Sequence, residues 1–271
     1  MTAPVAIKRL PFTQVDAFAD RPFAGNPAAV IPLDGWLDDA TLHAIAAENN
    51  VSETAFLVPQ AAGDADYELR WFTPTAEVAL CGHATLASGH VVLSADPSSD
   101  RVRFRTRKAG LLEVARDGAG YRLALPAWTP AARPLPGIVA ALGVAATETL
   151  WRDGGYAVVV VADEAAVRAC RPDQRALAAE GELLIIVTAP GDDTAIVTRA
   201  FTPAFGIDED PVTGAAHAVV VPYWARRLGE DRFTAFQASA RGGRLTCALE
   251  GDRVVLGGTC VTVIEGIFLL G

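Results

Sequence analysis

The chain of 271 residues is acidic, with 23 Lys and Arg against 32 Asp and Glu, a net charge of -9 and a pI near 4.9. Nucleic acids and anionic membranes are bound through basic patches, so this balance argues against both as partners. With 51% hydrophobic and 20% charged residues, we expect a large folded core, and the length fits two domains of average size.

The residues that bind metals or form disulfides are few and scattered. Four Cys and four His occur, with neither a Cys-x-x-Cys nor a His-x-x-x-His spacing, so we expect no structural metal site. Scattered cysteines are typical of a reducing compartment, and residues 1–8 lack an apolar core of signal-peptide length, so we expect a cytoplasmic protein. The longest apolar run, residues 157–162, is too short to span a bilayer and predicts a buried strand.

Patterning predicts strands and two helices in the first half. An amphipathic helix is expected at residues 38–48, capped by Asp38 or Asp39. Residues 82–93 are apolar or small on every side, which predicts a buried helix. The predicted strands are residues 10–18, 28–31, 55–58, 67–72, 102–107 and 111–116.

The second half repeats this pattern after a proline-rich segment, residues 126–136, that we interpret as a linker. A short helix is expected near residues 165–170, and a second apolar helix at 214–228. The predicted strands are residues 157–161, 183–188, 195–201, 244–249, 253–256 and 261–270. Each half is thus strand-rich around one central apolar helix, which is an α+β organisation rather than a doubly wound sheet.

These elements predict two lobes. We expect an N-terminal lobe at residues 1–125, with its central helix at about 82–94, and a C-terminal lobe at 126–271, with its central helix at about 214–228. The sequence leaves open whether the last strand stays in the second lobe or crosses to the first.

One short motif occurs twice. Arg-x-Phe-Thr-Pro stands at residues 70–74 and again about 130 residues later at 199–203, which suggests two similar lobes rather than a solenoid. Each copy leads to a glycine that opens an apolar helix, Gly82 and Gly214. The first N–H groups of a helix have no intrahelical partner, so both helix starts are candidate anion sites. The alternative is that the glycines only permit tight packing there.

Three titratable residues are candidates for chemistry. Glu53 precedes an apolar strand, where partial burial would raise its pKa toward that of a general base. Its alternative is an exposed loop glutamate. His83 follows Gly82 at a helix start, where a cleft can open, and Asp210 precedes the second helix glycine by four residues.

The other histidines have plainer interpretations. His90 and His217 lie on the apolar helices and are interpreted as hydrogen-bonded core groups. His43 lies on the amphipathic helix and is expected at the surface. Cys81 would fit a racemase with one thiol at each helix start, but the matching positions 211–213 hold no cysteine. A symmetric two-thiol mechanism is therefore excluded, and Cys81 is interpreted as a small packing residue.

Several motifs in order along the chain resemble the PhzF-like (phenazine biosynthesis-like) isomerase family, which is similar in fold to diaminopimelate epimerase. The resemblance implies two pseudo-symmetric lobes, each a curved, mostly antiparallel sheet around its central helix, with the active site between them. It also implies a homodimer and an enzyme without a cofactor. The motifs are Asp16-Ala17-Phe18, Gly25-Asn26-Pro27, Ser52-Glu53-Thr54-Ala55-Phe56, Cys81-Gly82-His83-Ala84-Thr85, Glu209-Asp210-Pro211-Val212-Thr213-Gly214 and Arg241-Gly242-Gly243.

The resemblance also implies roles for single residues. In the well-understood member a glutamate moves a proton between carbons of a cyclic dihydro-hydroxyanthranilate, and that glutamate matches Glu53. The family's histidine and aspartate match His83 and Asp210, and its helix glycines match Gly82 and Gly214. Many members have a serine where this chain has Ala215, which removes a hydroxyl but leaves the backbone N–H.

These observations lead to one hypothesis and two alternatives. The hypothesis is a cofactor-independent isomerase that moves a proton on a small carboxylate-bearing substrate. Glu53 acts as base and then as acid, and His83 and Asp210 orient the substrate or relay protons. The helix starts at Gly82, Gly214 and Ala215 bind the carboxylate. The alternatives are a single-base epimerase, racemase or dehydratase of an amino or hydroxy acid, and a small-molecule-binding protein without turnover.

Overall fold

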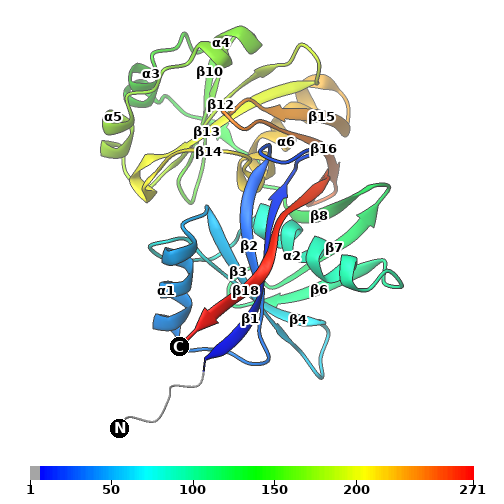
Figure 1. The fold of residues 1–271 in the computed structure, drawn as a ribbon. Helices are drawn as coiled ribbons and strands as arrows, with labels where there is room; N and C mark the ends of the chain where they lie inside the picture. Colours follow the sequence, from blue (N-terminus) through cyan, green and yellow to red (C-terminus); the bar gives the residue numbers. More distant parts are fainter. Residues whose placement is uncertain (1–6) are drawn as a thin grey trace. The chain divides into compact units, whose positions relative to one another are not determined.

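A computed structural model describes residues 7–271 as two compact units (Figure 1). Unit 1 contains the described residues up to Pro22, then Pro27–Leu123 and Thr259–Gly271. Unit 2 contains Phe23–Asn26 and Ala124–Gly258. The described residues include no helix long and apolar enough to cross a membrane.

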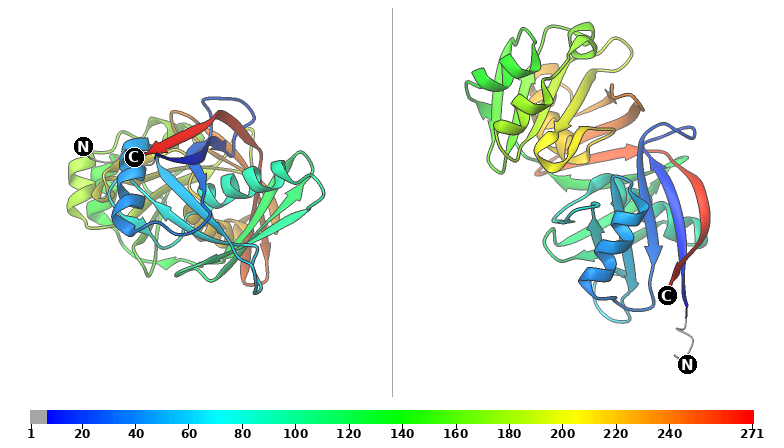
Figure 2. Two further views of the ribbon diagram at one scale, coloured as in Figure 1. Left: turned by 60° about the horizontal axis from the view of Figure 1, so that its bottom comes forward. Right: turned by 60° about the vertical axis from the view of Figure 1, so that its left-hand side comes forward.

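Unit 1 is built on a mostly antiparallel sheet. The β2–β3 and β4–β6 pairs are parallel, whereas β3–β4, β6–β7 and β7–β8 are antiparallel. The last strand, β18, runs antiparallel to β1 along its whole length, as Figures 1 and 2 show. The strands are β1 (Lys8–Ala17), β2 (Asn26–Pro32), β3 (Glu53–Pro59), β4 (Tyr67–Phe72), β5 (Glu77–Val78), β6 (Arg101–Thr106), β7 (Leu111–Asp117), β8 (Gly120–Pro126) and β18 (Cys260–Leu270).

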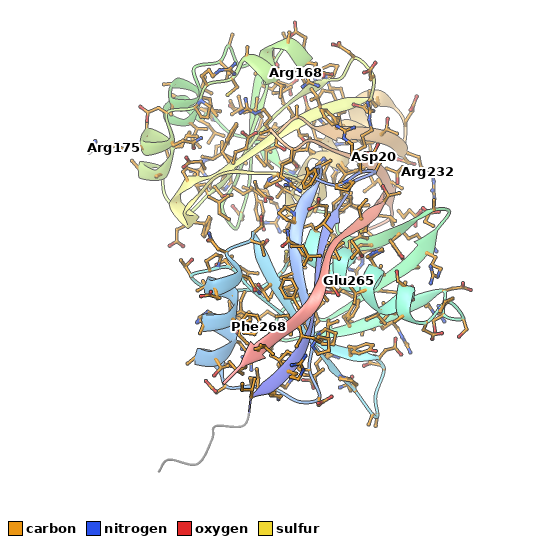
Figure 3. All side chains as sticks on the ribbon, in the orientation of Figure 1. Asp20, Arg168, Arg175, Arg232, Glu265 and Phe268 are labelled. Atoms are coloured by element: carbon orange, nitrogen blue, oxygen red, sulfur yellow. The ribbon has the colours of Figure 1, made fainter. Side chains whose placement is uncertain are left out.

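Two helices cover the strands of unit 1. Helix α1 (Asp39–Asn49) begins where the Asp38 carboxylate accepts a hydrogen bond from the Thr41 N–H, as the cap prediction requires. Its buried side joins a core that contains Phe56 and Phe72, against which Phe268 of β18 packs (Figure 3). Helix α2 (Gly82–Ala95) contacts β1, β3, β6 and β7 and is buried over its first eight residues, Gly82 to Gly89.

One surface assignment is wrong. His43 on α1 is half-buried, because its ring packs edge-on against Phe72 with the ring centroids 5.0 Å apart. The moderate hydrophobic pattern of α1 did not reveal that β4 reaches this side of the helix.

Unit 2 repeats the connectivity of unit 1. Its β11–β12 and β13–β15 pairs are parallel, and β12–β13, β15–β16 and β16–β17 are antiparallel. In both units a short strand precedes the central helix, and the chain after that helix forms the next strand of the sheet. The strands are β9 (Ala131–Ala132), β10 (Glu148–Arg152), β11 (Tyr156–Val160), β12 (Leu184–Pro190), β13 (Ile196–Thr202), β14 (Ile207–Asp210), β15 (Arg232–Gln237), β16 (Gly243–Glu250) and β17 (Arg253–Gly258).

The helices of unit 2 lie on both faces of its sheet. Helices α3 (Pro136–Leu142), α4 (Glu164–Ala169) and α5 (Gln174–Ala179) share one core with β11, β12 and β13. Helix α6 (Gly214–Leu228) contacts β11, β16 and β17 and is buried from Ala216 to Ala225. Strands β11 and β12 are therefore covered on both faces, which explains their largely apolar sequences. The α+β expectation and the two buried helices are confirmed.

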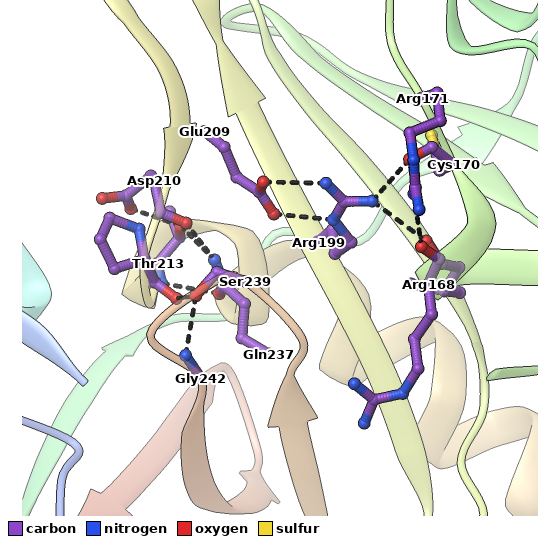
Figure 4. Close-up of polar contacts among 12 residues, drawn as sticks. Arg168, Cys170, Arg171, Arg199, Glu209, Asp210, Thr213, Gln237, Ser239 and Gly242 are labelled. Atoms are coloured by element: carbon purple, nitrogen blue, oxygen red, sulfur yellow. Dashed lines mark hydrogen bonds and ion pairs between the residues drawn. The ribbon is translucent and has the colours of Figure 1, made fainter. Parts of the chain in front are cut away.

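The repeated Arg-x-Phe-Thr-Pro motif has the same structural role in both units. Arg70 donates two hydrogen bonds to Glu77, at 2.8 and 2.9 Å. Arg199 donates two to Glu209, at 2.7 and 2.8 Å (Figure 4). The phenylalanine two residues later is buried in both copies. Each bidentate pair ties the strand that ends at Thr-Pro to the short strand before the central helix. The repeat thus holds the chain that leads into each helix start.

Candidate active site

Three side chains meet at the start of α2 in unit 1. The Nε2 atom of His83 lies 3.1 Å from Oε2 of Glu53, and its Nδ1 atom lies 3.5 Å from Sγ of Cys81. His83 is 4% exposed and the Glu53 side chain 14%, so the alternative of an exposed loop glutamate is wrong. Strand β3 begins at Glu53 and α2 begins at Gly82, and this arrangement places the carboxylate beside the first turn of the helix.

Burial and charge set the protonation of this group. Burial raises the pKa of the Cys81 thiol to about 11, so the sulfur keeps its proton at neutral pH. Burial also disfavours the charged form of His83. The Cys81 sulfur at one ring nitrogen and the Glu53 carboxylate at the other favour that form, and together they outweigh the effect of burial. The pKa of His83 is therefore raised well above its ordinary value of 6.5. The Glu53–His83 pair holds a proton at neutral pH.

The same three residues are the candidate for a metal site among residues 7–271. One ligand atom from each of Glu53, Cys81 and His83 lies within 4.8 Å of the others. However, Cys81 and Glu53 face opposite nitrogens of the imidazole ring. An ion bound to one ring nitrogen would lie beside only one of these two residues. All three could therefore bind a single ion only if their side chains moved. The geometry therefore fits a Glu53–His83 ion pair, with the Cys81 sulfur at the other ring nitrogen, better than a metal cage.

Asp210 is the centre of a second polar group, at the start of α6 in unit 2. Its Oδ1 atom accepts a hydrogen bond from the Asn26 amide at 2.8 Å. Its Oδ2 atom accepts one from the Thr213 hydroxyl, and Figure 4 shows both of these residues. Asn26 also donates to the Val212 carbonyl at 2.9 Å. The carboxylate accepts both bonds, which is the role of the ionised form.

Gln237 fastens the corner between β14 and α6. Its side-chain oxygen accepts from the Thr213 N–H at 2.8 Å, and its side-chain nitrogen donates to the Asp210 carbonyl at 2.7 Å (Figure 4). Gln237 is fully buried. We did not predict this residue from the sequence. The available signal was a polar residue on the buried side of β15, where Phe233 and Ala235 are its alternate neighbours.

The Gly25-Asn26-Pro27 and Arg241-Gly242-Gly243 motifs, which lie far apart in the sequence, are in contact in unit 2. Arg241 donates to the carbonyls of Gly25 and Ala24, at 2.8 and 2.9 Å. The Gly25 N–H in turn donates to the Gly242 carbonyl at 2.7 Å. The loop that carries Asn26 is thus held by the loop after β15, which explains why the Gly-Asn-Pro and Arg-Gly-Gly motifs occur together.

Both central helices begin without a side-chain cap. Cys81 and Thr213 occupy the N-cap positions of α2 and α6, and neither makes a capping hydrogen bond. Gly82 and Gly214 are the buried first residues, and Ala215 is half-buried in the first turn. Backbone N–H groups of a first turn have no intrahelical acceptor, so both helix starts keep the donors that an anion needs.

The two histidines assigned to the core both make polar contacts, but His90 is only half-buried. His90 contacts the hydroxyls of Tyr121 and Thr262, at 3.1 and 2.8 Å. His217 is fully buried, its Nδ1 lies 2.8 Å from the Thr213 carbonyl, and burial lowers its pKa to about 4. A neutral, hydrogen-bonded imidazole in the core needs no further role.

Comparison with known proteins identifies the family. The family model described as phenazine biosynthesis-like protein matches residues 15–266. The chain belongs to the phenazine biosynthesis-like (PhzF) family. A Pseudomonas aeruginosa protein named an uncharacterized isomerase is 49% identical over 255 residues, which cover 93% of this chain and 96% of that protein.

Solved structures confirm the fold. A PhzF family protein from Enterococcus faecalis is 42% identical and superimposes with a TM-score of 0.90, covering 97% of this chain and all of that one. A hydroxyproline epimerase from Agrobacterium vitis is only 14% identical, with a TM-score of 0.64 over 97% of this chain and 93% of that one. The second likeness shows a shared fold and confirms the diaminopimelate epimerase-like architecture.

Proposed function

We propose that this PhzF family member is a cofactor-independent isomerase that moves a proton on a small carboxylate-bearing molecule. The observation that carries the proposal is the buried Glu53–His83 pair, 3.1 Å apart at the start of α2. Family membership and the naming of several relatives as isomerases support the reaction class. A carboxylate beside a protonated imidazole supplies both a base and an acid at neutral pH.

In the proposed reaction, the Glu53 carboxylate removes a proton from the carbon next to the substrate's carboxylate or carbonyl. The electron pair of that C–H bond moves toward the carbonyl oxygen. Glu53 then delivers a proton, its own or one exchanged with solvent, to a different carbon, and the electron pair forms the new C–H bond. The proton on His83 places a positive charge beside the Glu53 carboxylate, 3.1 Å away. The net change is the position of one hydrogen and one double bond, so no oxidant or cofactor is consumed.

The helix starts are proposed to bind the substrate. The N–H groups at Gly82 in α2, and at Gly214 and Ala215 in α6, would hold the carboxylate and the charge that develops in the transition state. Asp210 accepts hydrogen bonds only, so it would orient a substrate hydroxyl or ammonium. We propose, as the family resemblance implies, that one substrate molecule contacts residues of both units. We also propose that the protein is a homodimer and is located in the cytoplasm.

The alternatives give different products in one assay. Small carboxylic acids are incubated with the protein in D2O and followed by proton NMR. An isomerase incorporates deuterium at a new carbon, an epimerase exchanges and inverts the α-carbon, and a dehydratase releases water. Binding without exchange would favour the non-catalytic alternative, which Ala215 supports because the serine hydroxyl is absent. Exchange that survives in Glu53→Gln would refute the role of Glu53.

A further inference from the structure

The N-cap residues of the two central helices direct their side chains away from the helix. Asp38, Asp163 and Asp173 cap α1, α4 and α5, each accepting a hydrogen bond from the backbone N–H three residues later. Cys81 and Thr213, which begin the two central helices, make no such bond. Ser, Thr, Asp and Asn are the preferred N-caps, and a cysteine at this position therefore calls for another reason.

In both units the diverted side chain contacts an acid or base of the candidate site. The Thr213 hydroxyl donates to Asp210, and Sγ of Cys81 lies 3.5 Å from Nδ1 of His83. A neutral imidazole has one nitrogen that donates and one that accepts. A thiol that donates to Nδ1 therefore leaves the ring proton on Nε2, the nitrogen that faces Glu53.

We propose that Cys81 is a positioning residue that keeps the one ring proton of neutral His83 on Nε2, toward Glu53. This inference rests on the proposed function, in which the proton must face that carboxylate. The sulfur acts in both protonation states, because it donates to Nδ1 of the neutral ring and accepts from Nδ1 of the charged ring. The thiol itself keeps its proton at neutral pH, since burial raises its pKa to about 11.

The side chain of Cys81 is buried but makes no capping hydrogen bond to the first turn of α2. It is 6% exposed, yet the same backbone supports the helix start through another contact, the Thr85 hydroxyl donating to the Cys81 carbonyl at 2.6 Å. The side chain is therefore not needed to hold the first turn. What it does contact is the ring nitrogen that Glu53 does not.

The test measures the histidine nitrogens directly and needs no substrate. Protein labelled with nitrogen-15 in its four histidines is examined by NMR on the alkaline side of the His83 titration, and a His83→Gln spectrum identifies the His83 signals. In the native protein we expect Nε2 at the shift of a protonated nitrogen and Nδ1 at that of a bare nitrogen. In Cys81→Ala and Cys81→Val we expect both shifts to move only part of the way toward the midpoint, because the Glu53 carboxylate beside Nε2 still favours the same tautomer.

The valine variant separates hydrogen bonding from packing, because valine fills the space without a donor. If Cys81→Val kept the native shifts, or if native Nδ1 carried the proton, the inference would be overturned. Cys247→Ala is the matched control, since it removes sulfur from a buried site whose pKa is shifted by burial alone, and it should leave the His83 shifts unchanged. Exchange that survives in Glu53→Gln would refute the proposed function without altering this result.

Discussion

Replacement of Gln237 by leucine tests how strongly the Asp210 corner depends on one buried amide. Leucine has a similar volume but neither donor nor acceptor. It would remove the bonds at 2.8 and 2.7 Å that join the Thr213 N–H and the part-buried Asp210 carbonyl to this fully buried side chain. An unsatisfied buried polar group costs about 1–3 kcal/mol, so two of them lower the free energy of unfolding by about 2–6 kcal/mol.

The measurement is urea unfolding followed by circular dichroism, with Gln60→Leu as the matched control. Gln60 is half-buried and its Oε1 atom has no hydrogen-bond partner, so its replacement should change the free energy of unfolding by less than about 1 kcal/mol. If Gln237→Leu lost no more unfolding free energy than Gln60→Leu, the hydrogen bonds of Gln237 would not stabilise the corner between β14 and α6.

Three further results are expected. Arg199→Met breaks the bidentate bond to Glu209 and should cost about 3 kcal/mol of unfolding free energy, since both side chains are largely buried. The same change at the half-exposed Arg168 should cost under about 1 kcal/mol. His217 has a pKa lowered to about 4, so the native protein should lose up to about 3 kcal/mol as the pH falls from 6.5 to 4, and His217→Leu should lack this loss. His83 has a raised pKa, so its stabilisation is complete below pH 6.5 and is lost as the pH rises through the folded pKa; a His83→Gln variant whose unfolding free energy kept the same alkaline slope would contradict this.

The sequence was sufficient for the parts of the structure that local patterns determine. The two central helices are apolar on every side and can only be buried, and α2 and α6 are. The cap at Asp38 predicted the start of α1. The half-chain repeat predicted the repeated connectivity, because a strand that ends at Thr-Pro before an apolar helix is visible in both copies.

Contacts between distant residues could not be read in the same way. The bond from Asn26 to Asp210 joins residues 184 positions apart, and nothing in either local sequence indicates the partner. The burial of His43 depends on Phe72 of a later strand. Cys81 is buried, in keeping with a packing residue, but its contact with His83 two residues away could not be read from the motif.

The most direct test of the proposal that Glu53 and His83 move a proton is deuterium incorporation by matched variants. Native protein, Glu53→Gln, and the exposed control Glu48→Gln are compared in D2O on a carboxylic acid that the native protein labels. Loss of a general base typically costs about 100- to 10,000-fold in rate, so Glu53→Gln should fall by at least about 100-fold while Glu48→Gln stays at the native rate. Equal incorporation by all three proteins would contradict the account.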